Sequence, residues 1–144
     1  VLEHERLRGG HNLVIGNDGV AIVNDSFGKA VRFYDLDAGQ LRRTTDLTEF
    51  EWVRDLIRWE VPMYWGKEAL RKVGGIEGSV AKPLFVRGLA RWEDTLFICV
   101  SPAAILQVDV ATGTLVDAYQ YSSNVHACIH GLAVLNDAAF QAEA

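Results

Sequence analysis

Three versions of one phrase decide the fold of this chain: HNLVIGND at residues 11–18, RGLARWED at 87–94 and HGLAVLND at 130–137. Leu13, Leu89 and Leu132 hold the same place in the three versions, so successive copies lie 76 and 43 residues apart. The second spacing matches the length of a repeat built from four antiparallel strands, about 40–45 residues. The sequence therefore predicts a repeat protein.

The rest of the unit also repeats. Residues 20–25 (VAIVND) correspond to residues 96–101 (LFICVS), and residues 31–39 (VRFYDLDAG) correspond to residues 105–113 (ILQVDVATG). The Ala-Gly and Thr-Gly pairs that end the longer segments supply the residue of positive φ that a tight hairpin with a bulge requires. Residues 41–47 and 115–121 follow as fourth strands. Each complete copy therefore predicts a four-stranded antiparallel meander.

We expect one mainly β domain over residues 1–144, with repeats at about 10–47, 84–121 and 126–144. The units resemble the blades of β-propellers, loosely the six-bladed NHL and SMP-30/gluconolactonase type. The resemblance rests on the opening phrase, the apolar second strand, and YDLDAG (34–39) or VDVATG (108–113) before the last strand. It implies a partial ring of about two and a half blades. The repeats lack a Trp-Asp ending and a kelch-type double glycine, which disfavours those two propeller families.

Length sets the next expectation. Propellers close with about four to eight blades, whereas this chain supplies two complete repeats and the opening strand of a third. An unfinished sheet exposes an edge that recruits another strand or must be covered. We therefore expect a homo-oligomer, and favour a dimer of two half-rings. The alternative is that the chain is a fragment of a longer product, for which Val1 in place of Met leaves room.

A helical insertion at about 48–75 separates the first two repeats. Thr48 and Glu51 have the order of a capping box, and apolar residues at helical spacing predict a helix over about 49–60 that ends before Pro62. A second, shorter helix is expected over 66–73. The insertion holds three of the four tryptophans, at positions 52, 59 and 65. Packing on a sheet or a second subunit is favoured over a role as a ligand lid.

The candidate site comes from equivalent positions in the repeats. His11, Arg87 and His130 open the three versions of the phrase, so a radial arrangement would bring them to the mouth of a central channel. The ends of the second strands would add Asp25 and Ser101, and the insertion would add Trp52, Trp59 and Tyr64. Two imidazoles and a guanidinium suit a small anionic ligand such as a carboxylate or phosphate. The alternative is a structural role for the polar side chains.

Other chemistry finds little support in the sequence. An Arg at one of three equivalent positions disfavours a metal site, and no metal or other cofactor is implied. No nucleophile, phosphate-loop or zinc motif is found, so the catalytic residues are unknown and a non-enzyme is favoured. SMP-30-like enzymes would need a Glu beside the opening strands, and none is evident. Cys99 is expected to be a buried small hydrophobe, and Cys128 a free thiol.

Composition narrows the partners. The chain has 144 residues, of which 49% are hydrophobic, and a formal net charge of −5. This charge argues against a nucleic-acid partner, because phosphate binding needs clustered cations. No apolar run reaches the roughly 18–20 residues that span a bilayer, so we expect no membrane partner and a soluble, cytoplasmic protein. The favoured function is a non-catalytic binding or assembly module that self-associates through sheet edges and the aromatic insertion. A hydrolase- or lyase-like small-molecule site at the channel mouth is the alternative.

Overall fold

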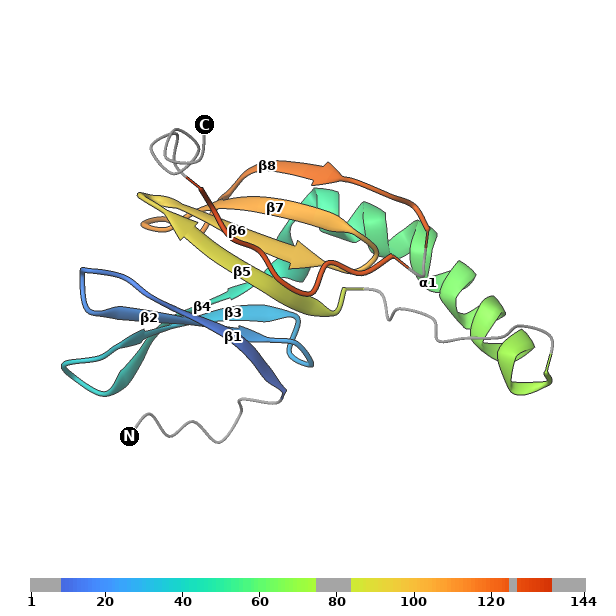
Figure 1. Ribbon diagram of the computed structural model, residues 1–144, viewed down its shortest axis with the longest axis horizontal. Helices are drawn as coiled ribbons and strands as arrows, with labels where there is room; N and C mark the ends of the chain where they lie inside the picture. The colour runs from blue at the N-terminus through green and yellow to red at the C-terminus, as the bar shows by residue number, and fades with distance from the viewer. Residues whose placement is uncertain (1–8, 75–83, 125–126, 136–144) are drawn as a thin grey trace, which may run out of the picture.

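The strands form two four-stranded antiparallel sheets, with one long helix between them along the chain (Figure 1). This computed structural model describes residues 9–74, 84–124 and 127–135, except for the side chains at 59–64, 67, 68 and 71. Sheet A contains β1 (Gly10–Ile15), β2 (Val20–Asp25), β3 (Ala30–Asp35) and β4 (Gln40–Asp46). Sheet B contains β5 (Val86–Trp92), β6 (Thr95–Val100), β7 (Ala104–Asp109) and β8 (Leu115–Gln120). In both sheets the spatial order follows the chain order, so the predicted meanders are confirmed.

The predicted hairpins are confirmed in detail. Gly39 and Gly113 occupy the turns before β4 and β8 with φ of 66° and 76°, a conformation that side chains with a Cβ rarely adopt. Beyond each turn the pairing register shifts, in β4 between the partners of Phe33 and Tyr34, and in β8 between those of Gln107 and Val108. The two bulges therefore lie at the same place in the two sheets.

One core fills the space between the sheets. Ile22, Val31 and Phe33 of sheet A belong to the same buried cluster as Ile98 and Leu106 of sheet B. Leu47, Val53 and Leu56, from the segment after β4, complete it. Full burial of an aliphatic side chain of this size contributes roughly 1.5–3 kcal/mol, so this contact is the main source of stability.

The structural alignment of β2 with β6 differs by one residue from the sequence alignment of residues 20–25 with residues 96–101. Asp25 pairs with Ala30 in sheet A, and the equivalent pair in sheet B is Val100 with Ala104. Asp25 therefore corresponds to Val100 and Ser26 to Ser101, which corrects the alignment of Asp25 with Ser101. The cause is the first turn, because Leu13 pairs with Val23 whereas Leu89 pairs with Ile98, so the β5–β6 connection is one residue shorter.

The insertion forms one long helix, so the prediction of two helices separated at Pro62 is wrong. A short 3₁₀ helix, η1 (Leu47–Glu49), leads through an extended Phe50 to α1 (Glu51–Lys72). Pro62 removes one backbone hydrogen bond, and the strong helix formers Lys67, Ala69 and Leu70 continue the helix beyond it. Among the described residues, no helix is both long and apolar enough to cross a membrane.

The cap also differs from the prediction. Asp46 caps η1, because its Oδ1 accepts hydrogen bonds from the backbone N–H and the hydroxyl of Thr48 at 2.8 and 2.7 Å. Thr48 is thus a donor within this cap and not the cap of α1. Phe50 stands at the start of α1, where its carbonyl accepts from the backbone N–H of Arg54 at 3.0 Å.

Residues 127–135 lie against sheet B, at the predicted opening of the third repeat (Figure 1). No strand is assigned over these residues. The backbone N–H of Ala103 donates to the carbonyl of Ala127 at 3.2 Å. A methyl group on Gly88 would lie 2.6 Å from Sγ of Cys99 and 3.3 Å from Cβ of Leu132, so only glycine allows this close approach. The remainder of the predicted repeat, 136–144, lies outside the described residues.

Candidate functional site

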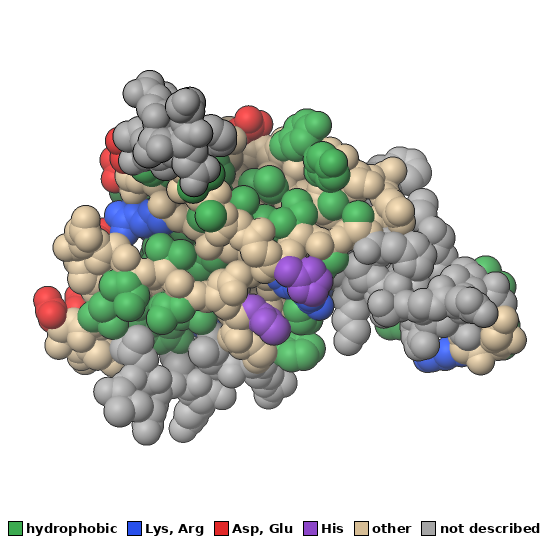
Figure 2. Space-filling view, in the orientation of Figure 1, with side chains coloured by type: hydrophobic (Ala, Val, Ile, Leu, Met, Phe, Trp, Pro, Cys, Tyr) green, Lys and Arg blue, Asp and Glu red, His purple; other side chains and the backbone are tan. Residues whose placement is uncertain are grey.

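The three aligned polar residues lie in one cluster with Phe85, which His11 and Arg87 contact. Nη1 of Arg87 lies 2.6 and 2.7 Å from the two ring nitrogens of His130. The Arg87 guanidinium carbon is 4.6 Å from the centre of the Phe85 ring, and the His11 ring meets the same ring edge-on at 5.5 Å. We call His11, Phe85, Arg87 and His130 the rim cluster. Figure 2 shows the two described histidines side by side, with a basic side chain beneath them.

Two asparagines join the strands at the rim cluster. The Asn12 side chain donates to the carbonyls of Arg87 at 2.6 Å and His130 at 3.4 Å. The Asn24 side chain donates to the Arg87 carbonyl as well, at 2.8 Å. β1, β5 and the segment at His130 are therefore tied together side by side. The Asn12 and Asn24 side chains thus link neighbouring repeats at the rim, and the predicted ligand-binding role of His11, Arg87 and His130 stays a prediction.

Asp25 lies in a different environment from the one expected. It is fully buried, and its Oδ2 forms an ion pair of 2.6 Å with Arg32. Its Oδ1 accepts from the backbone N–H of Gly28 at 2.9 Å. Since both oxygens are engaged within sheet A, the carboxylate fastens the β2–β3 turn and does not face a ligand.

The aromatic residues of the insertion do not gather over the rim cluster in the described part of the chain. Trp52 is half-buried and packs against the core. The side chains of Trp59 and Tyr64 lie outside the described residues, so their predicted place at the site stays a prediction. The first turn of α1 borders the β7–β8 turn, where Phe50 and Trp52 line a shallow cavity with Thr112 and Leu115.

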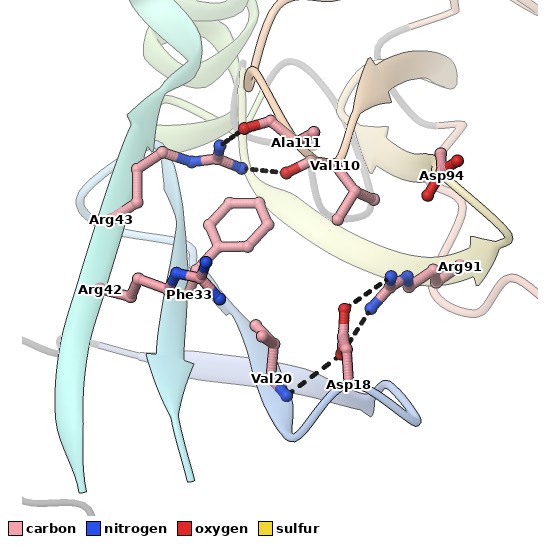
Figure 3. Close-up of a pocket in the computed structure, with 9 residues that line it drawn as sticks. All are labelled: Asp18, Val20, Phe33, Arg42, Arg43, Arg91, Asp94, Val110 and Ala111. Carbon is pink, nitrogen blue, oxygen red and sulfur yellow. Dashed lines mark hydrogen bonds and ion pairs between the residues drawn. The ribbon is translucent and has the colours of Figure 1, made fainter. Parts of the chain in front are cut away.

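A second polar site lies between the two sheets. It is a cleft of about 360 Å³, which we call the arginine cleft. Figure 3 shows its lining: Asp18, Val20, Phe33, Arg42, Arg43, Arg91, Asp94, Val110 and Ala111. This site was not predicted from the sequence. Its volume falls within the range of small-molecule pockets, about 300–1,000 Å³.

Two arginines of β4 form one wall of the cleft. Arg43 donates to the carbonyls of Val110 and Ala111, each at 2.7 Å, and its guanidinium carbon lies 4.0 Å from the centre of the Phe33 ring. Burial, and then the charge of Arg42, lower the pKa of Arg43. Nε of Arg43 is buried without a partner. Arg42 makes no hydrogen bond or ion pair with the described residues and points into the cleft (Figure 3).

The bulge in β4 explains why consecutive residues share this wall. Successive side chains of a regular strand point to opposite faces of the sheet. Phe33 pairs with Arg43 and Tyr34 with Leu41, so Arg42 is the extra residue of the bulge. Bulges re-aim side chains, often beside functional sites. A pair of arginines just after the Ala38-Gly39 turn was the one sequence signal for this cleft.

The opposite wall carries both signs of charge. Arg91 holds Asp18 with two hydrogen bonds of 3.1 and 2.9 Å. The hydrogen bond from Arg91 is the main reason that the pKa of Asp18 lies below its ordinary value. Asp94 lies beside this pair, and its carboxylate has no partner within the described part of the chain. Of the three arginines that line the cleft, Arg91 is the one that forms an ion pair within the described part of the chain.

The other candidate metal-binding and thiol side chains in the described part of the chain form no metal cluster, and one of the two cysteines is buried. The described residues contain no group of three or more His, Cys, Asp or Glu placed to hold a metal ion. Burial raises the pKa of the Cys99 thiol to about 11, which keeps it protonated at neutral pH. Cys128 Sγ lies 3.1 Å from the Ser101 hydroxyl oxygen. Cys99 is therefore buried and unreactive, as the sequence predicted.

No protein-family model matches this sequence, and a comparison with curated proteins finds no match.

Proposed function

We propose that this protein is a non-catalytic assembly module whose copies associate head to tail, sheet against sheet, as consecutive blades of a propeller-like ring. The observation that carries the proposal is the direction in which its two sheets stack. Sheet A packs on sheet B through one face, and sheet B packs on sheet A through the opposite face. The outer face of sheet A is therefore equivalent to the buried face of sheet B, and the outer face of sheet B is equivalent to the buried face of sheet A.

The stacking direction follows from equivalent residues. Ile22 and Val31 of sheet A belong to the core and face sheet B. The ladder pairing makes Phe97 and Ile105 their equivalents in sheet B, yet neither belongs to that core. Sheet B instead meets sheet A through its other face, with Ile98, Leu106 and Val108. Such a stack is heterologous, and heterologous contacts build rings or open filaments.

The outer face of sheet A is equivalent to the face of sheet B that packs in the core. Leu13 and Ile15 of β1 are 56% and 60% exposed. Leu89, the equivalent of Leu13 in β5, is only 5% exposed because it packs in the core between the sheets. A sheet placed against Leu13 as sheet A is placed against Leu89 would bury this apolar surface, which favours association by about 25 cal/mol per Å².

The outer face of sheet B begins a further layer. The Ser26 hydroxyl donates to the Val86 carbonyl, which ties the end of β2 to the opening of β5. At the equivalent place in sheet B, Ser101 contacts Cys128 of the segment that covers Gly88 and Cys99. Farther out, Tyr119 of β8 remains 64% exposed. The outer face of sheet B and the outer face of sheet A, which carries Leu13, are equivalent to the two surfaces that pack together between the sheets of one chain. A second copy of the chain therefore fits both outer faces.

The proposal is tested by the molar mass in solution, measured by light scattering and analytical ultracentrifugation. We expect a dimer, since two copies supply four sheets and a ring needs about four or more. Leu13→Arg should yield a monomer, because a buried unpaired charge opposes the contact. Leu70→Arg, at a similarly exposed position of α1, is the matched control and should leave the dimer intact.

Two results would overturn the proposal. One is a compact monomer at the highest attainable concentration. The other is a dimer that Leu13→Arg leaves unchanged, because the contact would then use another surface. Circular dichroism of both variants checks that the sheets are retained.

A further inference from the structure

We infer that the arginine cleft binds a small organic monocarboxylate with an apolar or aromatic body. This site is independent of self-association, because every residue that lines it comes from one chain and from the space between its two sheets.

Three arginines and two aspartates line the cleft, so the lining carries a net positive charge. Arg43 donates only to backbone carbonyls, and Arg42 has no partner among the described residues. Asp18 already pairs with Arg91. A carboxylate between Arg42 and Arg43 would gain charge-assisted hydrogen bonds, which are roughly twice as strong as neutral ones.

The apolar residues that line the cleft favour an apolar group on the rest of the ligand. Phe33, whose ring lies between the Arg42 and Arg43 side chains in Figure 3, and Val20 line the cleft, and Val110 lies across from them. Apolar walls with a few convergent polar groups are typical of sites for small molecules. An apolar body would rest on these side chains while its carboxylate reaches the β4 wall.

Asp94 argues against ligands with more negative charge. Its carboxylate lines the same cleft, and a second negative charge on the ligand would be repelled by it. A monocarboxylate is therefore preferred over inorganic phosphate or a dicarboxylate.

The second repeat shows that the fold does not require these arginines. The bulge of β8 lies at the same place as that of β4, but it carries Val116 followed by Asp117. The architecture therefore accepts other side chains at both positions. Of the equivalent bulges in β4 and β8, only the one in β4 carries a pair of arginines.

The experiment is a titration with benzoate, followed by backbone amide NMR on the protein as it stands. We expect saturable shifts at the described cleft residues. Benzyl alcohol, which keeps the ring without the charge, and inorganic phosphate, which lacks the ring and carries more negative charge, should each bind at least about tenfold more weakly.

Arg42→Gln should weaken benzoate binding by about tenfold, because it removes an unpartnered charge and no internal contact. Arg58→Gln, on the exposed side of α1, is the matched control and should change nothing. Asp94→Asn should strengthen binding, since it removes the repelling charge. This second variant keeps the inference falsifiable even if Arg42→Gln disturbs the strand.

Three results would overturn the inference: no saturable benzoate binding, benzoate affinity unchanged in Arg42→Gln, or phosphate binding more tightly than benzoate. The last result would indicate an anion site without selection for an apolar body. A folded monomer that still binds benzoate would separate this site from the proposed assembly.

Discussion

At the scale of single residues, two aspartates show how little the residue type says about its role. Asp25 was expected to face a ligand, yet it is fully buried and paired with Arg32. Asp18, in the turn after β1, bridges to Arg91 of β5 and so fastens sheet A to sheet B. Both carboxylates stabilise the fold through a cation, one within a sheet and one between sheets.

Asp25→Asn should lower the free energy of unfolding by about 3 kcal/mol, because it leaves the guanidinium of Arg32 buried without its counter-charge. Urea denaturation measures the change. Asp55→Asn breaks an exposed ion pair of 3.7 Å on α1 and serves as the control, with an expected change below about 1 kcal/mol. Equal effects of the two substitutions would contradict the assigned role of Asp25.

The Asp18–Arg91 pair predicts a dependence of stability on pH. Since its pKa is lowered in the folded state, Asp18 contributes stability that is present above the unfolded pKa, about 3.9, and is lost as pH falls through the folded pKa. Arg91→Gln should therefore destabilise the protein at neutral pH by less than about 1 kcal/mol, given the exposure of Asp18. The difference should narrow below about pH 4. Thermal unfolding across this pH range checks it, and a difference that grows in acid would contradict the assignment.

At the scale of elements, α1 has two unlike halves. Its first turns place Val53 and Leu56 in the core, whereas Trp65, Leu70 and Val73 near its end are exposed. In Figure 1 the helix passes sheet B and extends beyond it. Among the described side chains of α1, those of the first turns therefore contribute most to the stability of the isolated chain.

Leu56→Ala should lower the free energy of unfolding by about 2–4 kcal/mol, because it removes a buried side chain and leaves a cavity. Leu70→Ala removes the same atoms from an exposed position and should change it by at most about 0.5 kcal/mol. Chemical denaturation compares the two. A large loss from Leu70→Ala would contradict the exposure of this end of α1.

At the scale of the whole molecule, the stacking direction of the sheets links the fold to the proposed assembly. The melting temperature of an associating protein rises with its concentration, because association stabilises only the folded state. We expect this rise for the unaltered chain and its absence in Leu13→Arg. Scanning calorimetry over a wide concentration range measures both. If the melting temperature of the unaltered chain does not change with protein concentration, the proposed association of folded copies is contradicted.

The repeat, the four-stranded meanders and the hairpin glycines were all predictable from the sequence, because side-chain periodicity and positive-φ turns are local properties. Alignment also identified His11, Arg87 and His130, which the structure places in one cluster with Phe85. Local signals misjudged α1 at Pro62, since neighbouring residues and packing decide whether a helix continues past a proline.

Only the tertiary structure decided which side of each sheet is covered and where charges meet. The burial of Asp25, the exposure of Leu13 beside the burial of Leu89, and the arginine cleft all depend on residues far apart in the chain. A one-residue bulge in β4 placed Arg42 on the same wall of the cleft as Arg43, and the side-chain periodicity of the sequence does not predict this change of register. Strands and turns depend on residues that are neighbours in the sequence, whereas a site between two sheets forms only when the sheets pack together.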